Sequence, residues 1–303
     1  MTRILKIISN GLAPLTLLAA VAAYLHPPIF LPFSGSFLWF FAATMLALGV
    51  VLDPAEFVDT FKKPREIGLG LATQYSVMPI LGFVAAYFSG LDPELALGFV
   101  IVGCAPGAMA SNVIVYLAGG AVAYSVALTS IATFLSPLVT PSLVELLGGV
   151  FLPIPFWPMM NTILLTVLFP LVIGMALRRV LGSSLKRARE IAPAVAVTAI
   201  VIIIGYAVAA NQEQIARVGG AVFALVVLVN ALGYLIGWFL AALYRFERSY
   251  QLALMIEIGM QNAGLGVALA LQHFSPETAL PGVLFATWCI LTAAGATAFL
   301  RRR

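Results

Sequence analysis

The sequence predicts an all-α polytopic membrane protein, and three observations support that class. Of the 303 residues, 62% are hydrophobic and only 9% are charged, so the chain cannot cover itself with a soluble surface. Its apolar stretches repeatedly reach the roughly 20 residues that cross a bilayer as a helix. Lys and Arg collect in some of the short connecting segments and avoid the others. The expected partner is therefore the lipid bilayer, and the net charge of +4 needs no nucleic acid to explain it.

Ten transmembrane helices are expected from the apolar stretches. Little of the chain is left over for a separate soluble domain. The predicted spans are 11–30, 35–52, 67–89, 95–118, 121–147, 157–177, 191–210, 218–244, 249–272 and 279–300.

The basic residues test this count, because they accumulate in short cytoplasmic loops. If both termini are cytoplasmic, fifteen of the sixteen Lys and Arg fall in cytoplasmic segments, and only Arg217 lies on the other side. Adding or removing one span would scramble this pattern. We therefore expect an integral membrane protein with both termini in the cytoplasm. The fifteen are Arg3, Lys6, Lys62, Lys63, Arg65, Arg178, Arg179, Lys186, Arg187, Arg189, Arg245, Arg248 and Arg301 to Arg303.

A weak internal duplication divides the chain into 1–150 and 151–303. Gln74 and Asn230 are 156 residues apart, and so are Gly103 and Gly259. This offset places the third span on the eighth and the fourth on the ninth. Each half then has five spans, and because five is odd, the second half is inverted relative to the first, as in many secondary transporters.

The fourth and ninth spans carry helix-breaking residues at corresponding positions. Pro106 and Gly107 interrupt the fourth span, and the ninth contains Gly259 and Gly264 around two polar amides. Backbone groups freed in mid-membrane must find a partner in protein, ion or substrate. We expect each span to be two half-helices. The alternative is that Pro106 only kinks its helix and the glycines only allow close packing.

Glu257 is the only one of the twelve acids that lies well inside an apolar span. A carboxylate at membrane depth is costly and by default indicates a functional site on an ion pathway. At 1.5 Å per residue, other oxygen-bearing side chains lie at a similar depth, on the order of 6 to 12 Å from the cytoplasmic ends of their spans. Oxygen ligands without a thiolate or imidazole cluster favour a hard cation such as sodium. These side chains are Gln74, Ser111, Asn112, Ser125 and Thr129.

At these residues, and over essentially its whole length, the chain resembles the bile acid:sodium symporter family, and most closely its bacterial members. The resemblance implies that the protein lies in a bacterial inner membrane. The resemblance implies a panel domain from spans 1, 2, 6 and 7, and a core domain from spans 3 to 5 and 8 to 10, in which the broken fourth and ninth helices cross. It implies two sodium ions and no other cofactor. The first site would be Ser111, Asn112, Ser125, Thr129 and Glu257. The second would be Gln74, Glu257, Gln261 and the backbone carbonyls of Ile258 and Met260. The substrate would bind beside the crossing, near Met109, Ala110, Ser111, Asn112 and Asn262.

The predicted function is a sodium-coupled symporter of organic anions, such as bile acids or small carboxylates like pantoate, that works by alternating access. Met109 stands where many relatives carry a hydroxyl residue, which leaves the substrate open. The alternative is a proton-coupled exchanger of the same inverted-repeat type with Glu257 as the proton carrier. An enzyme is disfavoured because the sequence has no paired carboxylates, metal-spaced His or activated nucleophile, and a channel because one Glu makes no ring of charge.

Overall fold

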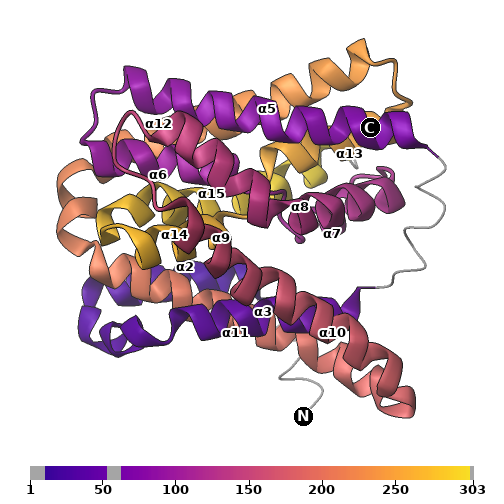
Figure 1. Ribbon diagram of the computed structural model, residues 1–303, viewed down its shortest axis with the longest axis horizontal. Helices are drawn as coiled ribbons and strands as arrows, with labels where there is room; N and C mark the ends of the chain where they lie inside the picture. The colour runs from indigo at the N-terminus through magenta and orange to yellow at the C-terminus, as the bar shows by residue number, and fades with distance from the viewer. Residues whose placement is uncertain (1–10, 53–62, 301–303) are drawn as a thin grey trace.

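The computed structural model describes residues 11–52 and 63–300, and these fold into helices (Figure 1). The described part of the chain contains no strand, apart from one isolated antiparallel bridge. Short 3-10 helices cover Pro27–Ile29, Leu31–Gly35 and Gly182–Ser184, and a π-helical turn, Leu164–Leu168, joins α9 to α10. The α-helices are α2 (Leu12–Leu25), α3 (Phe37–Val51), α5 (Pro64–Phe88), α6 (Pro93–Cys104), α7 (Ser111–Leu117), α8 (Val122–Gly148), α9 (Phe156–Ile163), α10 (Phe169–Val180), α11 (Leu185–Ala210), α12 (Gln212–Leu243), α13 (Arg248–Gly259), α14 (Ala263–His273) and α15 (Pro276–Leu300).

Several of these helices are suited to a bilayer by length and composition. The helices α5, α8, α11, α12 and the continuous α9–α10 segment are long and apolar enough to cross a membrane. Large apolar side chains also stand on the outer surface, among them Trp39, Phe88 and Val180, which are 77%, 78% and 81% exposed. In water such a surface would be costly, whereas hydrocarbon solvates it.

The helices form two layers (Figure 1). In the lower layer of this view, α3 packs against α10 and α11, and α11 also packs against α2. In the upper layer, α6 packs against α5, α8 and α15, while α12 packs against α5, α13 and α15. The helix α9 contacts α8 and α14 before the chain continues into α10. The chain passes between the layers again where α11 ends and α12 begins.

Proline decides where several helices begin or end. The first predicted span, 11–30, is shorter as a helix, because α2 ends at Leu25 and the next residue, His26, precedes Pro27. A residue before proline is pushed out of the α region. Pro64, Pro93 and Pro276 instead stand at the first position of α5, α6 and α15, where the missing N–H costs nothing.

The fourth and ninth predicted spans are each interrupted. The helix α6 ends at Cys104 and α7 begins at Ser111, while α13 ends at Gly259 and α14 begins at Ala263. The alternative in which Pro106 merely kinks a continuous helix is therefore wrong. The backbone between these helices is free to pair with something other than its own helix.

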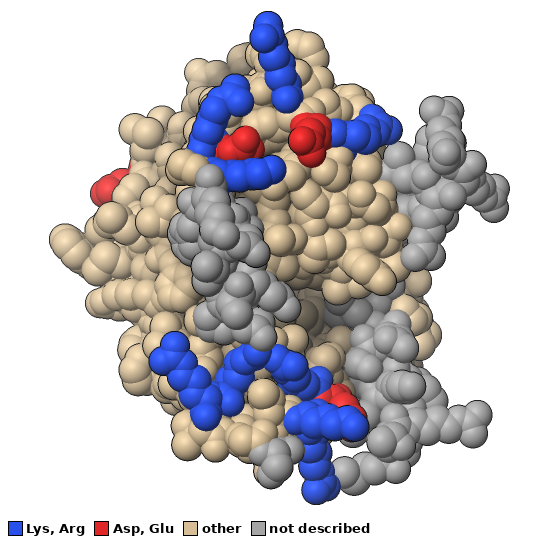
Figure 2. Space-filling view, turned by 90° about the vertical axis from the view of Figure 1, so that its right-hand side faces the viewer, with Lys and Arg blue, Asp and Glu red and all other residues tan. Residues whose placement is uncertain are grey.

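Basic side chains gather on one face of the molecule. Figure 2 shows them in two groups, above and below the middle of this face. Their sequence positions are the start of α5, the turn between α12 and α13, and the connection from α10 to α11. Arg217 lies on α12, 26 residues before that helix ends at Leu243, which is roughly 39 Å at a helical rise. The predicted cytoplasmic residues Arg3, Lys6, Lys62 and Arg301 to Arg303 lie outside the described residues.

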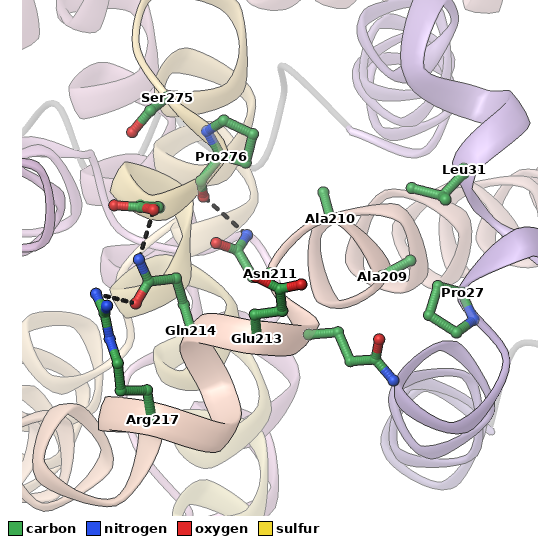
Figure 3. Close-up of a pocket in the computed structure, with 12 residues that line it drawn as sticks. Pro27, Leu31, Ala209, Ala210, Asn211, Glu213, Gln214, Arg217, Ser275 and Pro276 are labelled. Atoms are coloured by element: carbon green, nitrogen blue, oxygen red, sulfur yellow. Dashed lines mark hydrogen bonds between the residues drawn. The ribbon is translucent and has the colours of Figure 1, made fainter.

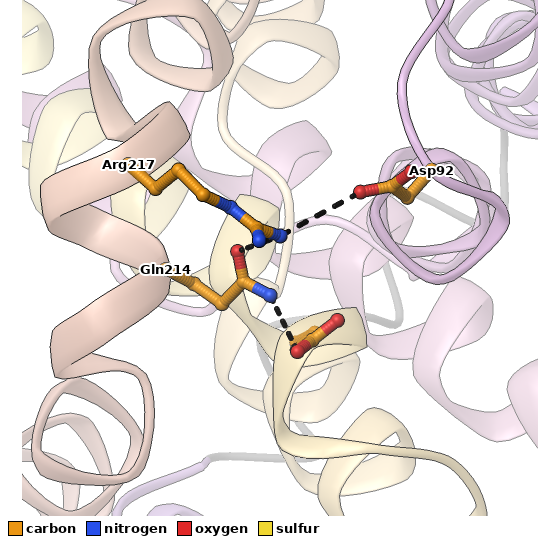
Figure 4. A network of polar contacts seen from close by, with 4 residues as sticks. Asp92, Gln214 and Arg217 are labelled. Atoms are coloured by element: carbon orange, nitrogen blue, oxygen red, sulfur yellow. Dashed lines mark hydrogen bonds and ion pairs between the residues drawn. The ribbon is translucent and has the colours of Figure 1, made fainter.

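Arg217 belongs to a polar network near the start of α12 (Figure 4). Its guanidinium lies 3.9 Å from a carboxylate oxygen of Asp92 and donates a hydrogen bond of 3.1 Å to the side-chain oxygen of Gln214. The amide of Gln214 in turn donates to Glu277. The network joins the start of α12 to the start of α15 and to the turn before α6.

A cavity of about 470 Å³ lies beside this network, where the two layers meet (Figure 3). The turn from α11 to α12 forms one wall, and Pro27 and Leu31 lie across from it. The Asn211 amide donates a 2.8 Å hydrogen bond to the carbonyl of Pro276, at the start of α15. Hydrogen bonds at this end of α12 therefore connect the turn between the layers to the upper layer.

Candidate functional site

The two interrupted helices meet at their breaks. The N–H of Ala108 donates to the carbonyl of Met260, and the N–H of Asn262 donates to the carbonyl of Pro106, both at 2.8 Å. Gly107 and Gln261 form the isolated antiparallel bridge between them. Part of the backbone that each break releases is thus satisfied by the other break, as burial in a lipid-facing protein requires.

The carboxylate of Glu257 lies against this crossing. A Cβ atom placed on Gly107 would overlap the Glu257 carboxylate. Gly107 is therefore needed for a close approach between the break in one helix and the acid on the other. This contact places the Glu257 carboxylate at the crossing of the two interrupted helices.

Three neutral hydroxyls surround the Glu257 carboxylate, which is 1% exposed. Ser111 and Ser125 donate to one carboxylate oxygen, at 2.6 and 3.1 Å, and Thr129 donates to the other. Ser111 begins α7, while Ser125 and Thr129 lie one turn apart on α8, as their spacing predicted. Two helices, α7 and α8, thus present hydroxyl oxygens to one buried charge on a third helix, α13.

The oxygen atoms around Glu257 outnumber the hydroxyl hydrogens that could form hydrogen bonds between them. Ser125 and Thr129 also approach the side-chain oxygen of Asn112, at 2.7 and 3.4 Å, and Thr129 approaches the carbonyl of Ser125 at 2.8 Å. Three hydroxyl hydrogens are therefore shared among six close oxygen pairs. A cluster that is rich in acceptors and poor in donors suits a cation.

The predicted second group also comes together. The amide of Gln74, which is fully buried, donates to the side-chain oxygen of Gln261 at 2.9 Å and to the carbonyl of Ala105 at 3.3 Å. Gln261 donates to the carbonyl of Ile258 at 2.9 Å. The side-chain oxygen of Gln74 is buried and has no hydrogen-bond partner. An unpaired buried oxygen is costly, and a cation would satisfy it.

The remaining predicted ligands of the second group are backbone carbonyls. That of Ile258 accepts from Gln261, and that of Met260 accepts from Ala108. A carbonyl oxygen has two lone pairs, so both can still bind a cation. The hydrogen bonds described for the Glu257 carboxylate all lead to the first group. Its sharing between the two groups stays a prediction.

The residues predicted to bind substrate lie on both sides of the crossing. Met109 and Ala110 are partly exposed in the segment before α7, while Ser111 and Asn112 belong to the group around Glu257. Asn262 immediately precedes α14, and its side-chain oxygen accepts a 3.1 Å hydrogen bond from the backbone N–H three residues on. Asn262 is therefore the N-cap of α14, a role that the sequence analysis did not assign.

Two further side chains stabilise the breaks and were missed as site residues. The hydroxyl of Thr140 donates to the carbonyl of Cys104, the last residue of α6, at 2.9 Å. The amide of Asn230 donates to the carbonyl of Gly259, the last residue of α13, at 2.8 Å. Asn230 had been noted only for the internal duplication, and Thr140 gave no signal among the many hydroxyl residues of α8.

The donor set indicates which kind of cation fits. Among the described residues, no three His, Cys, Asp or Glu side chains gather to hold a metal ion. Cys104 and Cys289 are both buried, as expected for packing residues. One carboxylate with hydroxyl, amide and carbonyl oxygens suits a hard cation and not a soft transition metal.

Apolar helices of membrane length, together with two interrupted helices that cross beside a buried acid, define an ion-coupled membrane transporter. Comparison with known proteins agrees. Residues 38–218 match the model of the Sodium Bile acid symporter family. The chain is 38% identical over 269 residues to the "Uncharacterized sodium-dependent transporter YocS" of Bacillus subtilis, covering 89% of this chain and 84% of that protein.

Plant proteins are also similar. The chain is 34% identical over 239 residues to the "Probable sodium/metabolite cotransporter BASS1, chloroplastic" of Arabidopsis thaliana, covering 78% of this chain and 60% of that protein. It is 30% identical over 260 residues to the "Probable sodium/metabolite cotransporter BASS2, chloroplastic" of Oryza sativa subsp. japonica, covering 86% of this chain and 62% of that protein. The chain thus spans less than two thirds of these two plant relatives.

The chain belongs to the Sodium Bile acid symporter family. It is an integral membrane transporter that depends on sodium as the coupling ion, and not an enzyme.

Proposed function

We propose that the protein is a sodium-coupled symporter of organic anions that works by alternating access. The observation that carries this proposal is the donor-poor oxygen group around Glu257. Three hydroxyl hydrogens cannot fully separate six close oxygen pairs beside a buried carboxylate, whereas a sodium ion would bind all of these oxygens at once.

Two sodium sites follow from the two groups. The first consists of Ser111, Asn112, Ser125, Thr129 and Glu257. Sodium there would offset the cost of the buried charge and connect α7, α8 and α13. The second consists of Gln74, Gln261 and Glu257 with the carbonyls of Ile258 and Met260. The unpartnered oxygen of Gln74 supports it.

The proposed architecture has ten membrane-spanning helices in two inverted repeats, 1–150 and 151–303. Pairs of contacts repeat at the same offset and support this division. A Cβ on Gly103 would overlap the carbonyl of Met78, and a Cβ on Gly259 would overlap the ring of Tyr234. Met78 and Tyr234 are 156 residues apart, as are Gly103 and Gly259.

Alternating access would move the two layers against each other. The lower layer of Figure 1, with α2, α3, α10 and α11, would be the panel domain, and the upper layer the core domain. The contacts around Asn211, in the turn from α11 to α12, would loosen when the two layers separate at the end of the molecule where this turn lies.

The basic face of Figure 2 would face the cytoplasm of a bacterial cell. A reporter fused after Arg303 should then be cytoplasmic, and a tag at 153–155 should be outside. Both markers on one side would contradict the inverted repeat.

The substrate would be an organic anion bound where α14 begins at the crossing, with α7 contributing from the other break. A helix N-terminus favours negative charge because its first N–H groups and its dipole point at the ligand. Small carboxylates such as pantoate and larger anions such as bile acids both carry the required group. The apolar part of the substrate would face the panel domain.

A thermal-shift experiment tests the whole proposal. The purified protein is heated in matched sodium and potassium buffers, with bile acids, pantoate and the methyl ester of each acid. We expect stabilisation by sodium, further stabilisation by at least one acid when sodium is present, and a much weaker effect of its ester. Stabilisation that follows pH and not sodium would instead favour the proton-coupled exchanger.

A further inference from the structure

Two buried amide side chains, Gln74 on α5 and Asn230 on α12, occupy equivalent places at the two breaks. Each donates to the end of the neighbouring interrupted helix: Gln74 to the carbonyl of Ala105, and Asn230 to the carbonyl of Gly259. They differ in their oxygen atoms. The Gln74 oxygen has no partner, whereas the Asn230 oxygen lies 3.1 Å from the hydroxyl of Thr292 on α15. Equivalent residues of the two halves therefore have different chemistry.

The contact made by Asn230 lies between two proposed sodium ligands. Gly259 stands between Ile258 and Met260, whose carbonyls belong to the second proposed site. A peptide unit is planar and rigid, so the direction of the Gly259 carbonyl sets the plane that leads into Met260. The side chain of Asn230 is 1% exposed and holds that carbonyl at 2.8 Å. The hydrogen bond thus fixes the backbone at the point where the ligand carbonyls diverge.

Thr292 orients this amide. Its hydroxyl is shared between the Asn230 oxygen and two carbonyls of its own helix, those of Trp288 and Cys289, at 3.1 to 3.2 Å. With the oxygen of Asn230 turned toward Thr292, its NH2 group faces Gly259. The result is a chain of side-chain contacts that runs from α15 through α12 to the end of α13.

We propose that Asn230 is a positioning residue for the second sodium site, oriented by Thr292, while its counterpart Gln74 is a ligand. This inference rests on the proposed function. Removing the Asn230 donor leaves the Gly259 carbonyl buried without a partner, so the end of α13 turns to satisfy it elsewhere and the flanking carbonyls leave the ion. Sodium affinity should fall, while the ligand side chains themselves remain unchanged.

The test is a sodium titration of thermal stability in purified protein, at constant ionic strength with potassium as the balancing cation. Asn230→Leu keeps the volume of the side chain and removes both polar atoms. We expect it to raise the half-saturating sodium concentration about tenfold, the size expected when a buried carbonyl loses its partner. Thr292→Val keeps the NH2 group of Asn230 but removes the hydroxyl that orients it. This variant should raise the half-saturating sodium concentration about threefold.

A control and a double-mutant cycle separate positioning from general destabilisation. Tyr75→Phe removes another hydrogen bond between helices of the upper layer, from Tyr75 to the carbonyl of Ala132. It should lower the melting temperature and leave the sodium midpoint unchanged. The effects of Asn230→Leu and Gln74→Ala on the free energy of sodium binding should be less than additive, because both act on the second site. The effects of Asn230→Leu and Ser125→Ala should be additive.

Two results would overturn the inference. In the first, wild type responds to sodium, but Asn230→Leu and Thr292→Val only lower the melting temperature as Tyr75→Phe does. In the second, Asn230→Leu adds fully to Gln74→Ala. A wild-type protein with no sodium response would remove the proposed function, and this inference with it.

Discussion

The replacement of Glu257 by Gln isolates the charge at the centre of the proposed sodium sites. The side chain is 1% exposed and accepts hydrogen bonds from three hydroxyls. Gln has nearly the same shape, and hydroxyl groups can rotate to donate to its oxygen or accept from its amide. The substitution therefore changes the charge while leaving the packing at the crossing close to that of the wild type.

The size of the effect follows from the loss of one charge interaction. Two unit charges about 4 Å apart gain about 4 kcal/mol at an effective dielectric constant of about 20. Losing this attraction corresponds to roughly thousandfold weaker sodium binding. The variant should be at least as stable as wild type without sodium, because it no longer buries a charge that lacks a countercharge.

The assay compares melting temperatures in sodium and in potassium. For wild type at a sodium concentration of about 100 times its Kd, ligand binding stabilises the fold by about 2.7 kcal/mol, and this gain should vanish in Glu257→Gln. Glu145→Gln, which neutralises an exposed acid near the end of α8, is the matched control and should keep the full sodium response. If sodium raised the melting temperature of Glu257→Gln as much as that of wild type, the assignment of this carboxylate as a ligand would be refuted.

Four further variants probe the same crossing. Ser125→Ala and Thr129→Ala should each raise the half-saturating sodium concentration for uptake about tenfold, because each removes one neutral ligand; unchanged uptake curves would exclude the first site. Gly107→Ala should abolish the sodium-dependent thermal shift, since its methyl group would displace the Glu257 carboxylate, whereas Gly68→Ala, where a Cβ meets no atom within 4 Å, should retain it. Asn262→Ala should lower stability by about 1 kcal/mol through loss of the α14 cap and should weaken substrate binding measured by calorimetry; equal sodium affinity would separate the two effects.

The candidate site could be predicted from the sequence because its residues are unusual in a membrane helix. An acid such as Glu257 or a Pro-Gly pair such as Pro106–Gly107 is costly in lipid unless protein surrounds it, so its position carries information. The spacing of Ser125 and Thr129 then defined one helix face, and the structure places both hydroxyls on the carboxylate. The interruptions of the two helices followed from the same local chemistry.

The supporting residues could not be found in this way. Thr140 bonds to the end of another helix, whereas Thr133 on the same helix bonds to the carbonyl of Thr129 one turn back. Both are hydroxyls in an apolar helix, and only tertiary packing decides which carbonyl is near. Asn262 was expected to contact substrate, but its capping bond depends on where α14 begins, and helix boundaries are the least certain feature of a sequence.

The position of Glu257 also explains why sodium and an anion should bind together under the proposed function. The carboxylate belongs to α13, the helix that is interrupted before α14, and it lies against Gly107 in the break between α6 and α7. Without sodium, its negative charge opposes a substrate anion at the same crossing, and in a low-dielectric site that repulsion is strong. Sodium removes the repulsion and connects α7, α8 and α13, so that the helix ends can attract the anion. Linkage is reciprocal, so sodium and the anion should each raise the affinity of the protein for the other by the same factor. Coupling then needs no signal over distance, since the ion and the substrate interact through one charge.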